Sequence, residues 1–584
     1  MDMKIIYVGN DSEARSRHLA KSDNVLLLLY DRWDDFGYKT RFPTHCRIDG
    51  KVVELGAIKI LFDGQQASHP YLVKRRDKGW NGRFPLDDAD YISVPEEITF
   101  YEQLQSLLSE DAARTMALAL RDASYLAHIE NDLAALALIG SEGFSTSLQR
   151  ERSTQQSFSE GWRVLSGETL GVANLGFRFR DATGALSLLN LHFSSASLLP
   201  HDVNVIIGPN GVGKSWLFRQ MVKAWLQPDA QHPALNGAGF DPRPNISQLV
   251  TVSYSPFEKL PVDTDEETDI EGQLKDKDIY RFFGFRGRKT PMPSKRPSAI
   301  RNSLGVPRAN AAMSLIQCLS DDMRYSTIKA WANKLRTLHK VLNQAIAFDV
   351  AAVKLTPDAP VEMIVADDPF DEVEIIEVEE VDEEGDVVIA RYLPIVAGTN
   401  RINLSALLDH VDLDGGVLFF NDNVPLPLSS GQRLFFYVVV NILGVIRRNS
   451  MVIVDEPELF LHPTLEVQFV SMLKQILRSY GSKALLATHS VVTVREVPSS
   501  CVHVFEKTDE GLVIKTPPFE TFGGDFQRIS TYVFGDRGIS KPHEIWLRGL
   551  LNTHGGAEEV IEALGEEVNE EIIIQLHAME AGKW

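Results

Sequence analysis

The chain has 584 residues, of which 44% are hydrophobic and 24% are charged. This length is about four times a typical domain of roughly 150 residues, so several domains and a large core are expected. The formal net charge is −21, from 59 Lys and Arg against 80 Asp and Glu. Taken whole, that charge argues against a nucleic-acid binder, because a phosphate-binding surface must be basic.

The negative charge is concentrated in three acidic patches, at residues 263–271, 355–390 and 551–584. Together they carry a formal charge of −27, which leaves +6 for the rest of the chain. The net charge therefore does not exclude a nucleic-acid partner. It indicates where such a partner is not expected to bind.

The three cysteines, Cys46, Cys318 and Cys501, are far apart and form no CxxC pair. That usage fits a reducing compartment, and the first residues lack the pattern of a signal peptide. The longest apolar stretch, Leu434–Ile446, is shorter than the roughly 20 residues of a membrane span. We therefore expect a cytoplasmic protein without a membrane partner.

Residues 1–165 are predicted to form an N-terminal α+β domain. Its expected strands are Lys4–Val8, Asn24–Tyr30, Thr40–Ile48 and Lys51–Phe62. Asp49 and Gly50, between the last two, form a hairpin signal. Apolar residues at helical spacing follow over about 97–138.

Two basic segments are candidates for contact with nucleic acid. Residues 71–84 hold five cations among aromatic residues, a mixture suited to phosphate contact and base stacking: Lys74, Arg75, Arg76, Lys78, Arg83, Tyr71, Trp80 and Phe84. Residues 281–301 hold seven cations and no acid: Arg281, Arg286, Arg288, Lys289, Lys295, Arg296 and Arg301. For each segment a solvated loop is an equally good interpretation.

A phosphate-binding loop is predicted at residues 208–215, which read GPNGVGKS and match GxxxxGK[S/T] in full. The loop follows the apolar strand Val203–Ile207 and precedes a helix over Trp216–Leu226, within a first ATPase lobe at 166–260. Its expected ligands to phosphate are Gly208, Asn210, Gly211, Gly213, Lys214 and Ser215. Lys214 would pair with the β- and γ-phosphates, and the Ser215 hydroxyl would bind Mg²⁺.

Residues 261–400 read as an insertion containing basic, helical and acidic segments. Helices are expected near 310–348, and the alternation of apolar residues in the acidic run 367–386 favours a solvated hairpin. A second ATPase lobe is predicted at 401–519. The last segment, 520–584, is predicted to be a helical tail that docks a partner.

Three further motifs fall in the second lobe. Leu428–Gln432 reads LSSGQ before the long apolar helix Arg433–Arg447, and its serines and glycine, Ser429, Ser430 and Gly431, together with Gln432, form a candidate anion site. Met451–Glu456 is an apolar strand ending in two carboxylates, with Asp455 a candidate Mg²⁺ ligand and Glu456 a candidate general base. His489 ends a third apolar strand.

In this order and spacing the four motifs resemble those of ABC-type ATPases of the SMC-like branch. LSSGQ is similar to the LSGGQ signature, with Ser430 replacing a glycine, and the stretch 455–463, DEPELFLHP, is similar to the form found in OLD-type defence ATPases. The resemblance implies an α/β ABC-type fold that binds ATP and Mg²⁺ between two chains arranged head to tail. It also implies that His489 contacts the γ-phosphate.

The chain departs from that pattern in several places. No glutamine can be assigned to the usual Q-loop, since Ser253–Glu258 occupies that region and Gln248 reads better as a strand-end residue. Only 95 residues follow His489, too few for an added nuclease domain, and Asp412 and Asp414 favour a turn over a metal site. A separate nuclease effector is therefore expected.

That combination is most similar to the ATPases of Septu anti-phage systems, including their retron-associated versions, which act with an HNH-nuclease partner. Two other interpretations stay open. One is an SMC-like ATPase of DNA repair or chromosome maintenance, and the other is a scaffold that binds ATP with little turnover.

Overall fold

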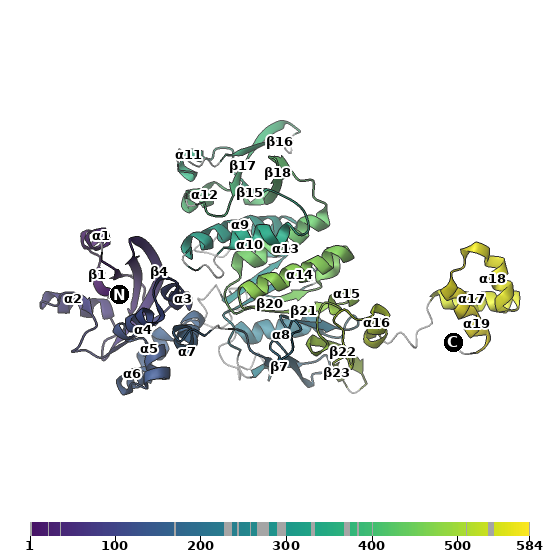
Figure 1. Ribbon diagram of the computed structural model, residues 1–584, viewed down its shortest axis with the longest axis horizontal. Helices are drawn as coiled ribbons and strands as arrows, with labels where there is room; N and C mark the ends of the chain where they lie inside the picture. The colour runs from purple at the N-terminus through teal and green to yellow at the C-terminus, as the bar shows by residue number, and fades with distance from the viewer. Residues whose placement is uncertain are drawn as a thin grey trace. The chain divides into compact units, whose positions relative to one another are not determined.

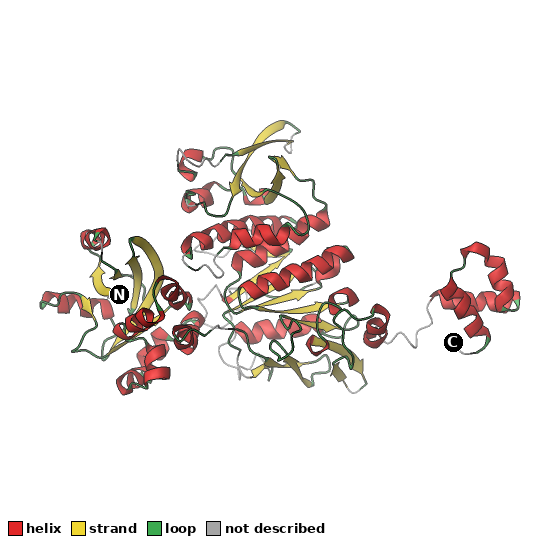
Figure 2. Cartoon of the chain, in the orientation of Figure 1, coloured by secondary structure: helices red, strands yellow, loops and turns green. Residues whose placement is uncertain are grey.

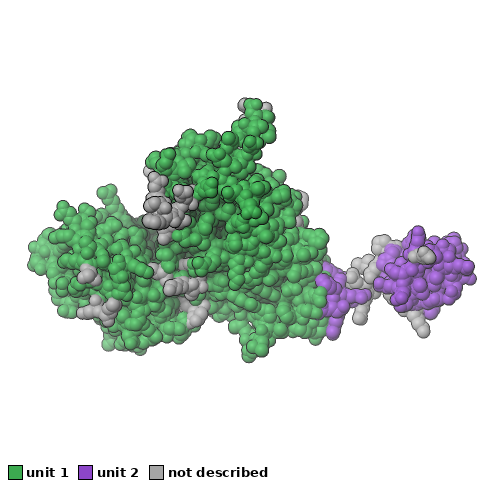
Figure 3. Space-filling view, turned by 45° about the horizontal axis from the view of Figure 1, so that its top comes forward, with its two compact units in different colours: residues 1–523 green, residues 524–584 purple. Residues whose placement is uncertain are grey.

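The computed structural model describes the whole chain apart from residues 1–2, 22, 36, 169–170, 227–235, 242–243, 257, 265–278, 289–298, 327, 329–332, 367–373, 382–384, 400, 510, 535–541 and 583–584. The chain divides into two compact units, Met1–Gly523 and Gly524–Trp584 (Figure 3). The five segments predicted from the sequence are finer than this division, and their boundaries stay predictions.

The N-terminal segment is built on a six-stranded sheet with the order β5-β1-β2-β3-β4-β6 (Figure 1). Its strands are β1 (Lys4–Gly9), β2 (Val25–Leu29), β3 (Arg41–Ile48), β4 (Lys51–Phe62), β5 (Arg83–Phe84) and β6 (Tyr91–Pro95). Its helices are α1 (Ser12–Ala20), α2 (Ser68–Asp77), α3 (Thr99–Leu107), α4 (Glu110–Ala119), α5 (Ala123–Tyr125), α6 (Leu133–Ile139) and α7 (Arg152–Leu165). All four predicted strands are present. Asp49 and Gly50 join β3 to β4 with φ of 48° and 83°, the left-handed conformation of a tight hairpin.

The ATPase region is organised around a seven-stranded sheet with the order β12-β11-β20-β21-β9-β22-β23, parallel except for β23. Its strands are β9 (Val203–Ile207), β11 (Gln248–Ser253), β12 (Tyr280–Gly284), β20 (Ser450–Asp455), β21 (Lys483–Thr488), β22 (Val502–Thr508) and β23 (Gly511–Lys515). A smaller antiparallel sheet combines β7 (Leu175–Arg180), β8 (Leu186–Leu191) and β10 (Gly239–Asp241). β9, β11 and β20 are buried along their whole length, which explains why their sequences are mainly apolar.

Helices cover both faces of the seven-stranded sheet (Figures 1 and 2). They are α8 (Lys214–Leu226), α13 (Ser430–Val445), α14 (Pro463–Ser479) and the short α15 (Val491–Val494). Leu217 and Met221 of α8 share one core cluster with Ile453 of β20. Val454, the next residue of the strand, faces the other way and lines a cavity with Phe435 of α13. The sheet is therefore the central layer, with helices packed on both of its faces.

The predicted insertion contains two long helices, α9 (Gly305–Arg324) and α10 (Lys334–Leu342), and the small hairpin β13 (Arg286–Arg288) and β14 (Ile300–Asn302). An antiparallel sheet with the order β16-β17-β15-β18-β19 follows it. Its elements are β15 (Val350–Lys354), α11 (Val361–Ile364), β16 (Ile376–Val381), β17 (Val387–Ile395), α12 (Leu404–His410), β18 (Val417–Asn421) and β19 (Val424–Pro425). β16 and β17 pair as the predicted solvated hairpin, with Val381, Val387 and Ile389 about two-thirds exposed. Residues 367–373 and 382–384 of the acidic run lie outside the described residues.

The second compact unit is helical, as predicted. It holds α16 (Phe526–Phe534), α17 (Pro542–His554), α18 (Ala557–Leu564) and α19 (Glu570–Glu580). Leu547, Val560 and Leu576 form a core of its own between the last three helices. Among the helices that the structure describes, in either unit, none combines the length and apolar character that a membrane crossing requires.

Candidate nucleotide-binding and catalytic site

The phosphate loop connects the buried strand β9 to α8, and its glycines are dictated by the backbone. Gly211 and Gly213 have φ of 74° and 103°, a region that side-chain-bearing residues rarely adopt. A Cβ at Gly208 would lie 2.4 Å from the carbonyl oxygen of Phe505. The predicted loop is therefore present at residues 208–213, and α8 begins at Lys214, two residues earlier than predicted.

Lys214 is buried at the start of α8, with 5% of its surface exposed. Its ammonium donates to the carbonyl oxygens of Gly208 at 2.9 Å and Pro209 at 3.3 Å, so the loop folds around it. Burial lowers the pKa of Lys214 to about 8, and the carboxylates of Glu456 and Asp455 act in the opposite direction. A cation held between these carboxylates and bare carbonyl oxygens is suited to exchange the carbonyl oxygens for phosphate oxygens.

Asp455 ends β20 and is 3% exposed. The Ser215 hydroxyl hydrogen-bonds to its carboxylate, and its Oδ1 is buried without a hydrogen-bond partner among the described residues. Burial raises the pKa of Asp455 to about 7, and the neighbouring charge of Glu456 adds to the rise. Mg²⁺ prefers oxygen ligands. A buried carboxylate oxygen that accepts no hydrogen bond, beside a hydroxyl oxygen, offers such ligands. These two residues therefore fit the predicted metal position.

Glu456 follows directly and adopts a left-handed conformation, with φ of 52° and ψ of 58°. Its backbone N–H donates to the carbonyl oxygen of Ala487 at 2.8 Å, so the ends of β20 and β21 are joined at this point. Strain of this kind in a residue with a side chain is common at functional sites. The Glu456 side chain is 26% exposed, and its Oε1 lies 3.6 Å from Nε2 of His489.

His489 lies immediately beyond β21. Its Nε2 is 2.8 Å from the Lys214 ammonium, which is a donor only, so the imidazole is neutral and accepts at this nitrogen. Burial lowers the pKa of His489, and the Lys214 charge lowers it further. The sequence-predicted phosphate loop, carboxylate pair and histidine are thus brought together by the carboxyl ends of β9, β20 and β21.

Glu458 is a further residue of this cluster, to which sequence analysis assigned no role. It lies in the short 3₁₀ helix Pro457–Phe460, and its Oε1 accepts from the His489 backbone N–H at 2.6 Å. Burial raises the pKa of Glu458. The signal that could have found it is the second glutamate in the DEPE sequence, two residues after Glu456.

The signature segment lies elsewhere. Ser429 caps α13 in a reciprocal arrangement with Gln432: the Gln432 N–H donates to the Ser429 hydroxyl and the Ser429 N–H to Gln432 Oε1. Ser429 and Ser430 are exposed, and α13 begins at Ser430, three residues earlier than predicted. Among the described residues, no hydrogen bond or ion pair joins 429–432 to the phosphate loop, the carboxylates or His489.

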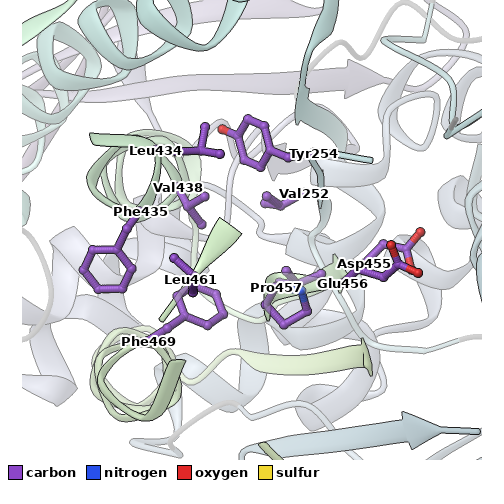
Figure 4. A pocket seen from close by; sticks show the side chains of 11 residues that line it. Val252, Tyr254, Leu434, Phe435, Val438, Asp455, Glu456, Pro457, Leu461 and Phe469 are labelled. Carbon is purple, nitrogen blue, oxygen red and sulfur yellow. The ribbon is translucent and has the colours of Figure 1, made fainter. Parts of the chain in front are cut away.

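The body of α13 nevertheless packs near the carboxylate pair. A mainly apolar cavity separates its first turns from the end of β20 and is lined by Val252, Tyr254, Leu434, Phe435, Val438, Val454, Asp455, Glu456, Pro457, Leu461 and Phe469 (Figure 4). Tyr254 follows β11 and occupies the region where a Q-loop glutamine was sought. Gln248 begins β11 and pairs with Ser450 at the start of β20, so it lies at the opposite end of the strands from Asp455.

The remaining candidate sites from the sequence are the pair Asp412 and Asp414 and the second basic segment. Asp412 accepts from the backbone N–H groups of Asp414 and Gly415, which makes the predicted turn, and the described residues hold no group of three or more potential metal ligands. In the second basic segment, Arg286 pairs with Glu258, Arg288 with Asp263 and Arg301 with Asp414. Lys289, Lys295 and Arg296 lie outside the described residues.

Comparison with known proteins agrees with this geometry. A family model described as "AAA domain, putative AbiEii toxin, Type IV TA system" matches residues 203–495, half of the chain, and spans every motif above. The chain belongs to this family. Its members are defined by the ATPase domain, so the expected ATPase domain and its α/β ABC-type fold are confirmed.

Two individual proteins are similar to this member of the family. Protein ea59 of Escherichia phage lambda is 25% identical over 533 residues, which cover 88% of this chain and 87% of that protein. Among solved structures, the crystal structure of the SmcHead bound to the C-winged helix domain of ScpA matches 60% of this chain and 98% of that chain. Its TM-score is 0.27 and its identity 11%.

Proposed function

We propose that this protein is a Mg²⁺-dependent ATPase that hydrolyses ATP between two chains arranged head to tail, and that turnover controls a separate effector. One contrast carries the proposal. Lys214–Ser215, Asp455–Glu456 and His489 converge on one point. The signature 429–432 is exposed at its two serines, and among the described residues it forms no hydrogen bond or ion pair with them.

Binding of ATP follows from the charges at the phosphate loop. Lys214 would release the carbonyl oxygens of Gly208 and Pro209 and donate to the β- and γ-phosphates. The α8 N-terminus and the backbone N–H groups of 208–213 supply further positive potential. Ser215 and Asp455 would hold Mg²⁺, which offsets phosphate charge when bound.

Hydrolysis needs a base beside the attacking water. Glu456 would accept a proton from that water, whose oxygen attacks the γ-phosphorus while the bond to the β–γ bridging oxygen breaks, giving ADP and phosphate. His489 is held by Glu458 through its backbone N–H and is close to both Lys214 and Glu456. When Lys214 turns to the phosphates, Nε2 of His489 would carry a proton and donate it in a hydrogen bond to the γ-phosphate.

The missing part of the site is a second anion-binding group. The N-terminus of α13 presents unpaired backbone donors and the exposed Ser430 hydroxyl, which suits a phosphate brought from outside the chain. In a head-to-tail pair, the signature of each chain would cover the nucleotide of the other. Two such sites per dimer follow from the twofold arrangement.

We place this ATPase in defence against phage, with a nuclease of the HNH type as its effector, as in Septu systems. Support comes from the family description, which names a putative AbiEii toxin and a Type IV toxin–antitoxin system. The acidic helical unit 524–584 is the segment we propose to dock the effector.

The central test is Glu456→Gln. We expect phosphate release to fall by about 10²–10⁴-fold, because the base is lost while the phosphate ligands remain. Mass photometry with ATP should detect a dimer that persists. Glu379→Gln, an exposed carboxylate of β16, is the matched control and should behave as wild type. Turnover at the wild-type rate in Glu456→Gln would contradict the assignment.

The effector is tested separately, by purifying the full chain together with the product of the adjacent gene. We expect a stable complex whose nuclease activity changes when Glu456→Gln replaces the wild-type chain. A complex with unchanged nuclease activity would contradict the regulatory role and leave the ATPase assignment intact.

A further inference from the structure

The N-terminal segment carries a cluster of exposed cations that comes from three separate elements. Arg17 and Lys21 belong to the end of α1, Lys74, Arg76 and Lys78 to the end of α2, and Arg83 to β5. The name "cationic face" is used below for these residues: Arg17, Lys21, Lys74, Arg76, Lys78 and Arg83. All six are exposed.

The sheet brings these elements together. β5 is an edge strand whose Arg83 pairs with Ile6 of β1, and the Arg76 guanidinium donates to the carbonyl oxygen of Val8 at the end of the same strand. α1 begins three residues after β1 ends (Figure 1). β1 is therefore the common support on which both helix ends and the edge strand are arranged.

The pKa of a neighbouring histidine also depends on the charges of the cationic face. His18, on α1, has its pKa lowered by partial burial and by the charges of Lys21, Arg17, Arg83 and Arg76. Residues from α1, α2 and β5 therefore contribute to one positive potential, although they are up to 66 positions apart in sequence.

The cationic face differs from its neighbours in its ion pairing. Among the described residues none of its six members forms a salt bridge, whereas the neighbouring Arg75 pairs with Asp88 and Lys4 with Asp23. The exposed acids on the same helices are Glu13, in the first turn of α1, and Asp77, the last residue of α2. Like charges four residues apart, as at 17 and 21 or 74 and 78, repel each other, so the fold gains nothing from them.

The aromatic residues of the same segment have other contacts. Phe84 is buried, Tyr71 packs on Phe62 with ring centroids 4.8 Å apart, and the Trp80 indole donates to the carbonyl oxygen of Arg83. Trp80 also stacks on Tyr7. Base stacking by these rings, suggested by the sequence, is therefore not what the fold offers.

We infer that the cationic face binds the phosphate backbone of a nucleic acid, through ion pairs alone and without reading the sequence. The expected binding is strongly salt-dependent, because each neutralised phosphate releases condensed counterions. This inference does not depend on the ATPase activity. It extends the predicted segment 71–84 to α1, whose Arg17 and Lys21 the sequence did not single out.

The test uses three charge reversals with the same spacing of four residues: Arg17→Glu with Lys21→Glu, Lys74→Glu with Lys78→Glu, and, as the control on the exposed side of α10, Arg336→Glu with Lys340→Glu. Fluorescence anisotropy with a labelled 30-base-pair DNA duplex at 50–200 mM salt measures binding to the full chain. Single-stranded DNA and RNA of the same length are further arms, and the tightest of the three identifies the form of nucleic acid.

Each of the first two double variants should weaken binding at least tenfold and reduce the slope of log K against log salt by about 2. The control should bind within twofold of wild type, and all three should retain wild-type ATP turnover and thermal unfolding. No wild-type binding at 50 mM salt, equal loss in the control, or loss on α2 alone would overturn the inference. Equal competition by vesicles of anionic lipid would do so too, since the face would then be a membrane surface.

Discussion

The N-termini of α8 and α13 both have backbone N–H groups that can bind phosphate, but their surroundings differ. At the start of α8, Lys214 is 5% exposed and lies beside the carboxyl ends of β20 and β21. The start of α13 is exposed at Ser429 and Ser430. The reciprocal cap there satisfies the N–H groups of Ser429 and Gln432, so Ser430 and Gly431 are the residues of this turn that could receive a phosphate. At α8 other elements bring a cation, carboxylates and a histidine to the helix N-terminus. Under the proposed function, the N-terminus of α13 obtains these from another chain.

Among the variants that test this difference between α8 and α13, Ser430→Arg is expected to have the largest effect. A long cation at the exposed start of α13 should reduce ATP turnover at least 100-fold, because it blocks approach of a second chain. Nucleotide affinity of the isolated chain, measured with a fluorescent ATP analogue, should stay within twofold. Ser145→Arg, at an exposed turn of the N-terminal segment, is the control.

Mixing two inactive variants tests whether the ATPase site is shared between two chains. Lys214→Ala and Ser430→Arg chains should each be inactive alone, and together should recover a fraction of wild-type turnover, because the mixed dimer contains one intact composite site. Absence of recovery when both chains form mixed dimers would argue that each site is completed within one chain.

Glu458→Ala tests the support of the α8 site. Loss of the acceptor for the His489 N–H should lower kcat about tenfold with KM within threefold, since the phosphate ligands are untouched. Glu458→Gln keeps an acceptor oxygen and should restore most of kcat. Equal loss in both variants would show that the charge, and not the hydrogen bond, is what matters.

Gly208→Ala strains the phosphate loop itself. The added Cβ would meet the Phe505 carbonyl oxygen at 2.4 Å, so we expect a loss of about 1–3 kcal/mol in the free energy of unfolding and weaker ATP binding. Gly171→Ala, whose Cβ would meet nothing within 4 Å, is the control. Urea titration measures the free energy of unfolding of both variants. An unchanged midpoint for Gly208→Ala would disprove the close contact.

The smallest effect concerns pH and the strand beside β9. His503 of β22 is buried, its Nε2 lies 2.9 Å from Oδ1 of Asn204, and burial together with His192 lowers its pKa to about 3. The unfolded chain takes up this proton below its ordinary pKa and the folded chain does not, so stability falls as pH drops below about 6.5. Between pH 7 and pH 5.5 the loss from this group should be about 1 kcal/mol. His503→Gln should reduce that part of the pH dependence, as followed by urea titration at each pH.

Local sequence was sufficient for much of the fold. The β9 strand, phosphate loop and α8 were located to within two residues, because glycines at positive φ and a mainly apolar buried strand are local requirements. The β16–β17 hairpin followed from alternation alone. By contrast, Gln248 and Tyr254 could not be placed from spacing, since only the parallel register shows which end of β11 faces Asp455.

The two basic segments illustrate what composition cannot distinguish. Both are rich in arginine and lysine, yet Arg286 and Arg288 are paired with acids from residues 258–263, while Lys74 and Lys78 form no ion pair among the described residues and are joined by charges from α1. Counting charges along the chain marks both segments as basic. Pairing in space separates them.

The sequence by itself determined the ATPase motifs, their order and the uneven charge behind a net −21, because each depends on residues close together in the chain. Only the tertiary structure decided which of these residues meet. Parallel strands bring their carboxyl ends to one edge, so Lys214, Asp455, Glu456 and His489 meet although they are up to 275 positions apart, with Glu458 added to them. The same packing leaves the signature exposed and gathers the cationic face on β1, since burial and register are properties of the assembled sheet.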